Sequence, residues 1–339
     1  MKSSDRNNHS LSQPSTLLQD GQGRRVDYLR LSVTDRCDLR CRYCLPRDHC
    51  KFEQPAHWLN YSEIERLVSA FARLGLKRVR LTGGEPLLRK NLAELAARLA
   101  VVPGIEDLSL STNGTQLKSY AGRLRNAGVS RLNVSLDTLD RARFAEITGR
   151  DVLPGVLDGL DAARAENFRL IKINMVALAD TTDDEVDAMT AYCLERGFVL
   201  RLIETMPIGE AGRKAGFVSL QPLQERLRAR YGLVDGMVPG GGPARYLVSA
   251  DGSFQIGFIT PLSQHFCDTC NRVRLGVDGM LYLCLGQNNT VDFRKLLRAG
   301  CSDFDIEAAV LTGLRNKPRS HDFTGHAQKL VRAMSATGG

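Results

Sequence analysis

Residues 34–44 read TDRCDLRCRYC and directly follow a segment, 28–34, whose alternating apolar and polar side chains predict a β-strand. The segment contains Cys37, Cys41 and Cys44 at the spacing C-x3-C-x2-C. Thiolates are soft ligands that suit iron–sulfur clusters, zinc or Cu(I). Three of them in one tight loop can hold three corners of a cubane and leave the fourth iron open to another ligand.

A second cysteine motif lies in the C-terminal part of the chain. Residues 266–274 read FCDTCNRVR, so that Cys267, Cys270 and the later Cys284 have the spacing C-x2-C-x13-C. The same donor chemistry allows a second cluster with one open iron. The two arginines of this motif offer planar forks of donors that suit a phosphate group.

Structural zinc is the alternative reading of both motifs, because zinc takes four protein ligands. His49 or Cys50 could be the fourth ligand of the first site, and His265 that of the second. The chain could then be a basic, zinc-binding nucleic-acid module without catalysis. A ferredoxin-like electron carrier would need four cysteines for each cluster and no barrel. Metal analysis of anaerobically purified protein separates these readings.

Strand and helix patterns alternate along the first two thirds of the chain. Strands are expected at 28–34, 78–82, 107–111, 131–136, 169–176 and 198–204, and helices at about 62–74, 91–101, 116–127, 153–166 and 182–197. Capping boxes formed by Ser62 with Glu65 and by Thr182 with Glu185 begin two of the helices. Six such units predict an α/β fold with a parallel sheet. A doubly wound sheet and a partial barrel both fit this order, with the polar candidates at strand C-termini.

Composition changes divide the chain into three parts. The segment 1–24 is polar and charged, and we expect a disordered tail there. The alternating units occupy 25–240, and a Pro- and Gly-rich break at 239–243 ends them. The region 241–339 contains the second cysteine motif.

Composition also limits the location and the partners of the protein. The nine cysteines are odd in number and no secretory signal is evident, which argues against a secreted disulfide framework and favours the cytoplasm. No apolar run is long enough to span a bilayer, so no membrane association is expected. The formal charge of +8 fits a polyphosphate ligand, whereas no dense Lys/Arg run with interleaved aromatic residues predicts nucleic-acid binding.

The first motif resembles the signature of the radical S-adenosylmethionine (SAM) superfamily. That signature is C-x3-C-x-aromatic-C after a first strand, and residues 82–86, TGGEP, look like its second motif after the next strand. Glycines there would let the backbone approach a ligand closely. The resemblance implies a partial (β/α)6 TIM-type barrel with a [4Fe–4S] cluster at its first cysteine loop. SAM would bind the open iron and be cleaved to a 5′-deoxyadenosyl radical.

Both cysteine motifs together resemble the GTP 3′,8-cyclase family of molybdenum cofactor biosynthesis over about residues 24–339. The segments 30–37 (RLSVTDRC) and 133–137 (NVSLD) and the final Gly-Gly match its pattern. The implied activity is that of a lyase: abstraction of the ribose 3′ hydrogen of GTP and closure onto C8, giving (8S)-3′,8-cyclo-7,8-dihydroguanosine 5′-triphosphate, the first step of that biosynthesis. A C-terminal extension would carry the second [4Fe–4S] cluster, whose open iron binds the guanine.

The resemblance also assigns the site residues by position. The cluster ligands would be Cys37, Cys41 and Cys44 for the SAM-bound cluster and Cys267, Cys270 and Cys284 for the substrate-bound one. The SAM contacts would be Tyr43, Gly84, Ser135 and Met206. The GTP contacts would be Arg30, Arg80, Ser111, Lys172, Arg272, Val273 and Arg274, with Arg272 and Arg274 positioning GTP and Val273 contributing only its backbone.

Partners follow from the same resemblance. A pterin monophosphate synthase would use the product, a flavodoxin-like or ferredoxin-like protein would supply electrons, and a homodimer is compatible with the sequence. The terminal Gly338-Gly339 would insert into the active-site cavity. The alternative within the superfamily is an enzyme with auxiliary clusters, such as a peptide maturase, although those have longer C-terminal cysteine sets.

Overall fold

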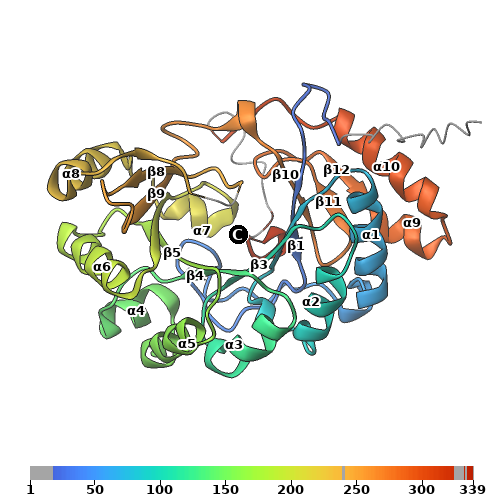
Figure 1. Cartoon of the computed structure of the whole chain (residues 1–339). Coiled ribbons are helices and arrows are strands. Elements are labelled where there is room, and N and C mark those ends of the chain that lie inside the picture. Colours follow the sequence, from blue (N-terminus) through green and yellow to red (C-terminus); the bar gives the residue numbers. More distant parts are fainter. Residues whose placement is uncertain (1–17, 239–240, 324–331, 333, 339) are drawn as a thin grey trace, which may run out of the picture.

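The computed structural model describes residues 18–238, 241–323, 332 and 334–338. In this part of the chain a 12-stranded sheet has the order β12-β11-β10-β1-β2-β3-β4-β5-β6-β9-β8-β7. The run from β10 to β9 is parallel, and antiparallel strands follow at both edges. Strands β1 to β6 lie in chain order, without the reversal that a doubly wound sheet has. The sheet is curved, with helices along its outer side (Figure 1), so the predicted partial barrel is confirmed.

The parallel strands are β1 (Tyr28–Ser32), β2 (Arg78–Thr82), β3 (Asp107–Thr112), β4 (Arg131–Ser135), β5 (Leu170–Ala177), β6 (Val199–Glu204), β9 (Gln255–Ile259) and β10 (Arg272–Leu275). The edge strands are β7 (Val234–Gly236), β8 (Arg245–Val248), β11 (Met280–Tyr282) and β12 (Thr290–Asp292). Strands β9 and β10 thus extend the parallel run that was predicted for β1 to β6, one at each side.

The helices of the barrel are α1 (Tyr61–Arg73), α2 (Leu92–Ala100), α3 (Leu117–Asn126), α4 (Arg141–Thr148), α5 (Leu153–Ala165) and α6 (Asp183–Arg196). Those that follow are α7 (Gly209–Lys214), α8 (Gln221–Tyr231), α9 (Phe293–Arg298), α10 (Asp303–Arg315) and α11 (Met334–Thr337). Short 3-10 turns are η1 (Pro55–His57), η2 (Pro86–Leu88) and η3 (Cys267–Thr269). Helix α4 was not predicted, because its 8 residues are too few for a clear apolar period.

One predicted capping box is wrong and the other is confirmed. Helix α1 is capped by Asn60, whose side chain accepts the Glu63 amide at 2.9 Å, while the Glu63 carboxylate accepts the Asn60 amide at 2.7 Å. Asparagine is as good an N-cap as serine, so the helix begins before Ser62 and the pair with Glu65 does not cap it. The box at residues 182–185 caps helix α6 as expected.

Alternation along the strands separates the apolar core from the barrel lumen. In β1, Leu29 and Leu31 belong to the large core that also contains Leu67 of helix α1. Their neighbours Tyr28 and Arg30 line a pocket on the opposite, inner side of the sheet. The outer face of the sheet therefore binds the helices through apolar contacts, and its inner face is left for polar chemistry.

The N-terminal tail is ordered earlier than predicted. Leu18 is 1% exposed and its amide donates to the Leu74 carbonyl at 3.1 Å. A bridge between Gln19 and Arg25 closes a turn. Burial of Leu18 in the main core explains why the segment 18–24 is fixed to the domain. The rest of the predicted tail, 1–17, lies outside the described residues.

The predicted boundary near residue 240 remains a prediction. Residues 239–240 lie outside the described part, and strands β7 and β8 on either side of them pair in the same sheet. Among the helices that the structure describes, none combines the length and apolar character needed to cross a bilayer.

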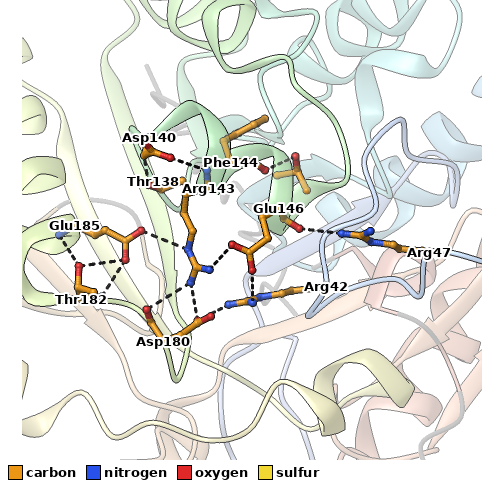
Figure 2. Close-up of polar contacts among 11 residues, drawn as sticks. Arg42, Arg47, Thr138, Asp140, Arg143, Phe144, Glu146, Asp180, Thr182 and Glu185 are labelled. Atoms are coloured by element: carbon orange, nitrogen blue, oxygen red, sulfur yellow. Dashed lines mark hydrogen bonds and ion pairs between the residues drawn. The ribbon is translucent and has the colours of Figure 1, made fainter.

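A charged network anchors the first cysteine loop to the outer rim of the barrel (Figure 2). Arg42, between two of the cysteines, pairs with Glu146 of helix α4 at 3.2 Å and with Asp180 in the turn after β5. Arg143 bridges the same two carboxylates, at 2.7 Å each. The amide of Arg42 also donates to the Ile147 carbonyl at 2.9 Å. The network therefore holds the loop against α4 and the β5–α6 turn.

Replacing Asp180 by Asn should loosen this anchor. The hydrogen bond from Arg143 lowers the pKa of Asp180 to about 2, so its stabilising charge is present above pH 4 or so and is lost as the pH falls toward that value. The carboxylate is half exposed, so we expect a loss of about 1 kcal/mol at pH 7 and low salt, and less at high salt. Urea unfolding of the apoprotein measures it.

The matched control for this prediction is Asp158→Asn. Asp158 has one exposed partner, Lys118, at 2.9 Å, and its loss should change the free energy of unfolding by less than about 0.5 kcal/mol. Equal unfolding midpoints for the Asp180 and Asp158 variants would contradict the anchoring role.

Candidate active site

The loops that follow β1 and β2 interlock through backbone hydrogen bonds. The Gly84 amide donates to the Thr34 carbonyl at 2.7 Å, and the Glu85 amide donates to the Arg36 carbonyl at 2.8 Å. A Cβ atom on Gly84 would lie 2.3 Å from the Arg36 carbonyl oxygen. The glycine is therefore required for contact between the two loops, in addition to the ligand approach that the sequence predicts.

The side chain of Glu85 ties a third loop to this pair. It is fully buried, and it accepts from the Thr112 hydroxyl at 2.7 Å and from the Asn113 amide at 2.6 Å. Burial raises the pKa of Glu85 to about 7. The Asn113 side chain reaches the sulfur of Cys37, at 3.7 Å. Three successive strand ends thus fix the first cysteine loop.

The first cysteine trio lines a pocket at the C-terminal end of the strands. The pocket is also lined by the four residues predicted to contact SAM, which are Tyr43, Gly84, Ser135 and Met206. The Tyr43 hydroxyl donates to the buried carboxylate of Asp137 at 2.8 Å, and that carboxylate also accepts the Val176 amide at 2.9 Å. Asp137 belongs to the NVSLD segment and ties the cysteine loop to β4 and β5.

Burial governs the chemistry of the first trio. It raises the pKa of Cys37 to about 12 and that of Cys44 to about 11, and it raises the pKa of Cys41 as well. Free thiols are therefore protonated at neutral pH in this pocket. A cationic metal cluster would release those protons, because its ligands are thiolates. Three thiols at one wall fit a cubane with one open iron.

The second cysteine trio lines an adjoining pocket. Cys267 begins the turn η3, Cys270 ends it, and Cys284 follows β11. Ser111, Asn174, Ile203 and Met206 line both pockets, so the two trios face the same lumen. Three thiols at the wall of this pocket fit a second cubane with an open iron. Among the described residues, no group of three or more His, Cys, Asp or Glu is arranged to hold a single metal ion.

A row of arginines lies beside the second trio. Arg30 is in register with Arg80 on one neighbouring strand and with Arg274 on the other, and all three line the second pocket. Burial, then Arg274 and Arg80, lowers the pKa of Arg30 well below its ordinary value. Burial and Arg272 lower that of Arg274 to about 10. Like charges on adjacent parallel strands form a site that favours an anion of several charges.

The structure brings together most of the residues predicted to bind GTP. Ser111, Arg272 and Val273 line the second pocket together with the arginine row. Lys172 is not among its lining residues, and its buried side-chain nitrogen donates to the Tyr246 hydroxyl at 2.8 Å. Burial, with Arg201 and other nearby arginines, lowers the pKa of Lys172 to about 6.

Sequence reasoning missed several residues of the lumen. Arg201 of β6 lines the second pocket and donates to the side-chain oxygens of Asn174 at 2.8 Å and Asn133 at 2.6 Å. An arginine within the apolar strand sequence VLRLI was the available signal, because a charge there must face the inner side. The buried Lys317 also lines this pocket, and no motif of the sequence marks it.

The C-terminal segment enters the lumen as far as Gly338, which agrees with what the family resemblance implies. The carbonyl of Gly338 accepts from Arg30 at 3.2 Å and from Arg274, which also donates to the Thr337 carbonyl at 3.3 Å. Gly338 is buried, and a Cβ atom there would overlap Thr82. The final Gly339 lies outside the described residues.

Replacing Gly84 by Ala should separate the two interlocked loops. The new methyl group meets rigid backbone, with carbonyl oxygens at 2.3 and 2.8 Å, so we expect the apoprotein to lose about 1–3 kcal/mol of stability in urea unfolding. The control is Gly155→Ala, in helix α5, where nothing lies within 4 Å and a gain of up to about 1 kcal/mol is expected. An unchanged midpoint for the Gly84 variant would rule out this steric role.

Sequence comparisons agree with this arrangement. Residues 31–193 match the model of the Radical SAM superfamily, and residues 198–323 match Molybdenum Cofactor Synthesis C. A protein of Ectopseudomonas mendocina named GTP 3′,8-cyclase is 46% identical over 95% of this chain and 98% of its own length. GTP 3′,8-cyclase 1 of Pseudomonas aeruginosa is 45% identical over 94% of this chain and 98% of its length.

Solved structures show the same fold. Streptococcus suis SuiB bound to S-adenosylmethionine has a TM-score of 0.61 and 16% identity, covering 86% of this chain and 68% of that one. SuiB alone has a TM-score of 0.60 and 15% identity, covering 82% and 66%. At this identity the likeness concerns the fold, and the assignment comes from the sequence relatives. The chain belongs to the GTP 3′,8-cyclase family of the Radical SAM superfamily.

Proposed function

We propose that the protein converts GTP to (8S)-3′,8-cyclo-7,8-dihydroguanosine 5′-triphosphate, the first step of molybdenum cofactor biosynthesis. The observation that carries this proposal is the pair of cysteine trios that face one lumen through adjoining pockets. One trio lies among the predicted SAM contacts, and the other lies beside a row of buried arginines that suits a triphosphate.

The residues of the first pocket hold and orient the cofactors. Cys37, Cys41 and Cys44 would bind the first [4Fe–4S] cluster, and Tyr43, Gly84, Ser135 and Met206 would contact SAM. When bound, the reduced cluster and SAM supply the 5′-deoxyadenosyl radical that abstracts the 3′ hydrogen of GTP. The interlocked loops fix the position of this pocket relative to the strands.

The residues of the second pocket hold the substrate. Cys267, Cys270 and Cys284 would hold a second [4Fe–4S] cluster, which would offer an open iron to the guanine. The triphosphate would be bound by the guanidinium groups of Arg30, Arg80, Arg272 and Arg274, with Ser111 and the Val273 backbone completing the contacts. Lys172, which is not among the lining residues of this pocket and is mostly neutral at pH 7, would join them by taking up a proton. Such a row fixes the ribose at the junction of the two pockets, which is catalysis by positioning.

The chemistry of the reaction suggests its partners. A one-electron donor, flavodoxin-like or ferredoxin-like, must reduce the first cluster, and a pterin monophosphate synthase would use the cyclised nucleotide. Reduced thiols and clusters of this kind are typical of the cytoplasm, where we place the protein. We also propose the domain boundary near residue 240, and a homodimer is compatible with the proposal.

The direct test is a product assay. Reconstituted protein is incubated anaerobically with dithionite, SAM and each nucleoside triphosphate in turn, with deuterium at the 3′ position of GTP. We expect GTP alone to give a product of new retention time that is an isomer of unlabelled GTP, and is therefore about one mass unit lighter than the labelled substrate, with the deuterium in 5′-deoxyadenosine. Cys37→Ser should abolish SAM cleavage. Deuterium retained in the nucleotide, or cleavage by the Cys37 variant, would refute the assignment.

Lys172 should bind a proton when GTP binds. Its pKa of about 6 leaves it mostly neutral at pH 7, and a triphosphate nearby raises that pKa, so uptake approaches about one proton at pH 7 and declines below pH 6. Calorimetry in buffers of different ionisation enthalpy measures the uptake. Lys172→Met cannot take up this proton, so its measured uptake gives the contribution of GTP itself. Equal uptake by the parent and the variant would contradict the role.

A further inference from the structure

A buried lysine, which the proposed reaction does not use, lies beside the second cysteine trio. Lys317 follows helix α10 and is 3% exposed. Its ammonium donates to the Leu283 carbonyl at 2.7 Å and to the Arg272 carbonyl at 3.1 Å, and it lies 3.6 Å from the sulfur of Cys270. These acceptors use all three of its donor hydrogens.

No carboxylate balances this charge among the described residues. The three acceptors of Lys317 are two neutral carbonyl groups and a sulfur. A buried ammonium without a countercharge is strongly destabilising, so the balancing charge must come from a group that the pocket binds. The sulfur of Cys270 is the acceptor that can become an anion, when it is a metal-bound thiolate.

Arg24 provides the contrasting case at the same loop. Its guanidinium donates to the carbonyls of Cys267 at 2.7 Å and Pro318 at 2.6 Å, and it pairs with the buried carboxylate of Asp20 at 2.6 Å. Arg24 therefore carries its own countercharge and joins the segment after Lys317 to the cysteine loop. The charge of Lys317 is left for the thiolates.

We propose that Lys317 is a positioning residue for the second cluster, acting as its charge partner and as the tie between its cysteine segments. One of the carbonyl groups that Lys317 binds belongs to Leu283, the residue before Cys284. The other belongs to Arg272, in strand β10, which follows Cys270. A positive charge and a hydrogen bond at a cluster sulfur favour the reduced state. This inference rests on the proposed second cluster.

The test isolates the second cluster in the full chain. In a background carrying Cys37→Ser, Cys41→Ser and Cys44→Ser, only the second trio can hold a cubane, of about four iron atoms. Lys317→Met removes the charge at similar volume, and Lys317→Arg keeps it. The control variant is Lys295→Met, which makes the same lysine-to-methionine replacement at an exposed position of helix α9. Iron content and the midpoint potential, followed by electron paramagnetic resonance, are measured.

The expected result is an iron content at least twofold lower in Lys317→Met, or a more negative midpoint potential, with Lys317→Arg and Lys295→Met close to the parent. If both properties are unchanged in Lys317→Met, the role of Lys317 is wrong while the second cluster stands. If the parent binds no iron, the second cluster itself is refuted, and the role with it. Circular dichroism checks that each variant folds. If Lys317→Met does not fold, Lys317→Gln is measured in its place.

Discussion

Arg30, Arg80 and Arg274 are in register on adjacent parallel strands, and all three line one pocket inside the barrel. Burial and the neighbouring arginines lower the pKa of Arg30 and of Arg274. The inner side of the sheet is thus built for an anionic guest. The Gly338 carbonyl, which Arg30 and Arg274 both bind, places a dipole of this chain in that field.

The two cysteine trios of the lumen have different charged surroundings. The first trio is held by interlocked backbone loops and by the carboxylates of Glu85 and Asp137, with a charged network behind it. The second trio shares a pocket with Arg272, Arg274 and Lys317, and the Lys317 ammonium lies 3.6 Å from the sulfur of Cys270. The two ends of the lumen therefore differ in charge. A positively charged sulfonium cofactor suits the first end, and a polyphosphate suits the second.

Local patterns predicted most of the barrel and both cysteine sites. The strands β1 to β6 followed from alternation, and the cysteine loops followed from spacing, because both are properties of neighbouring residues. The pairing of β10 with β1 and of β9 with β6 joins segments far apart in the chain, which no local pattern reports. Lys317 was missed for this reason, because the carbonyl groups that it binds belong to strand β10 and to the residue before Cys284.

Mössbauer spectroscopy of the wild-type protein, reconstituted with 57Fe, tests the central claim most directly. The account predicts about eight iron atoms per chain in two cubanes. Adding SAM should change one iron site of one cubane, and adding GTP should independently change one iron site of the other. A single cubane per chain, zinc bound in place of iron, or spectra that GTP leaves unchanged would contradict the account.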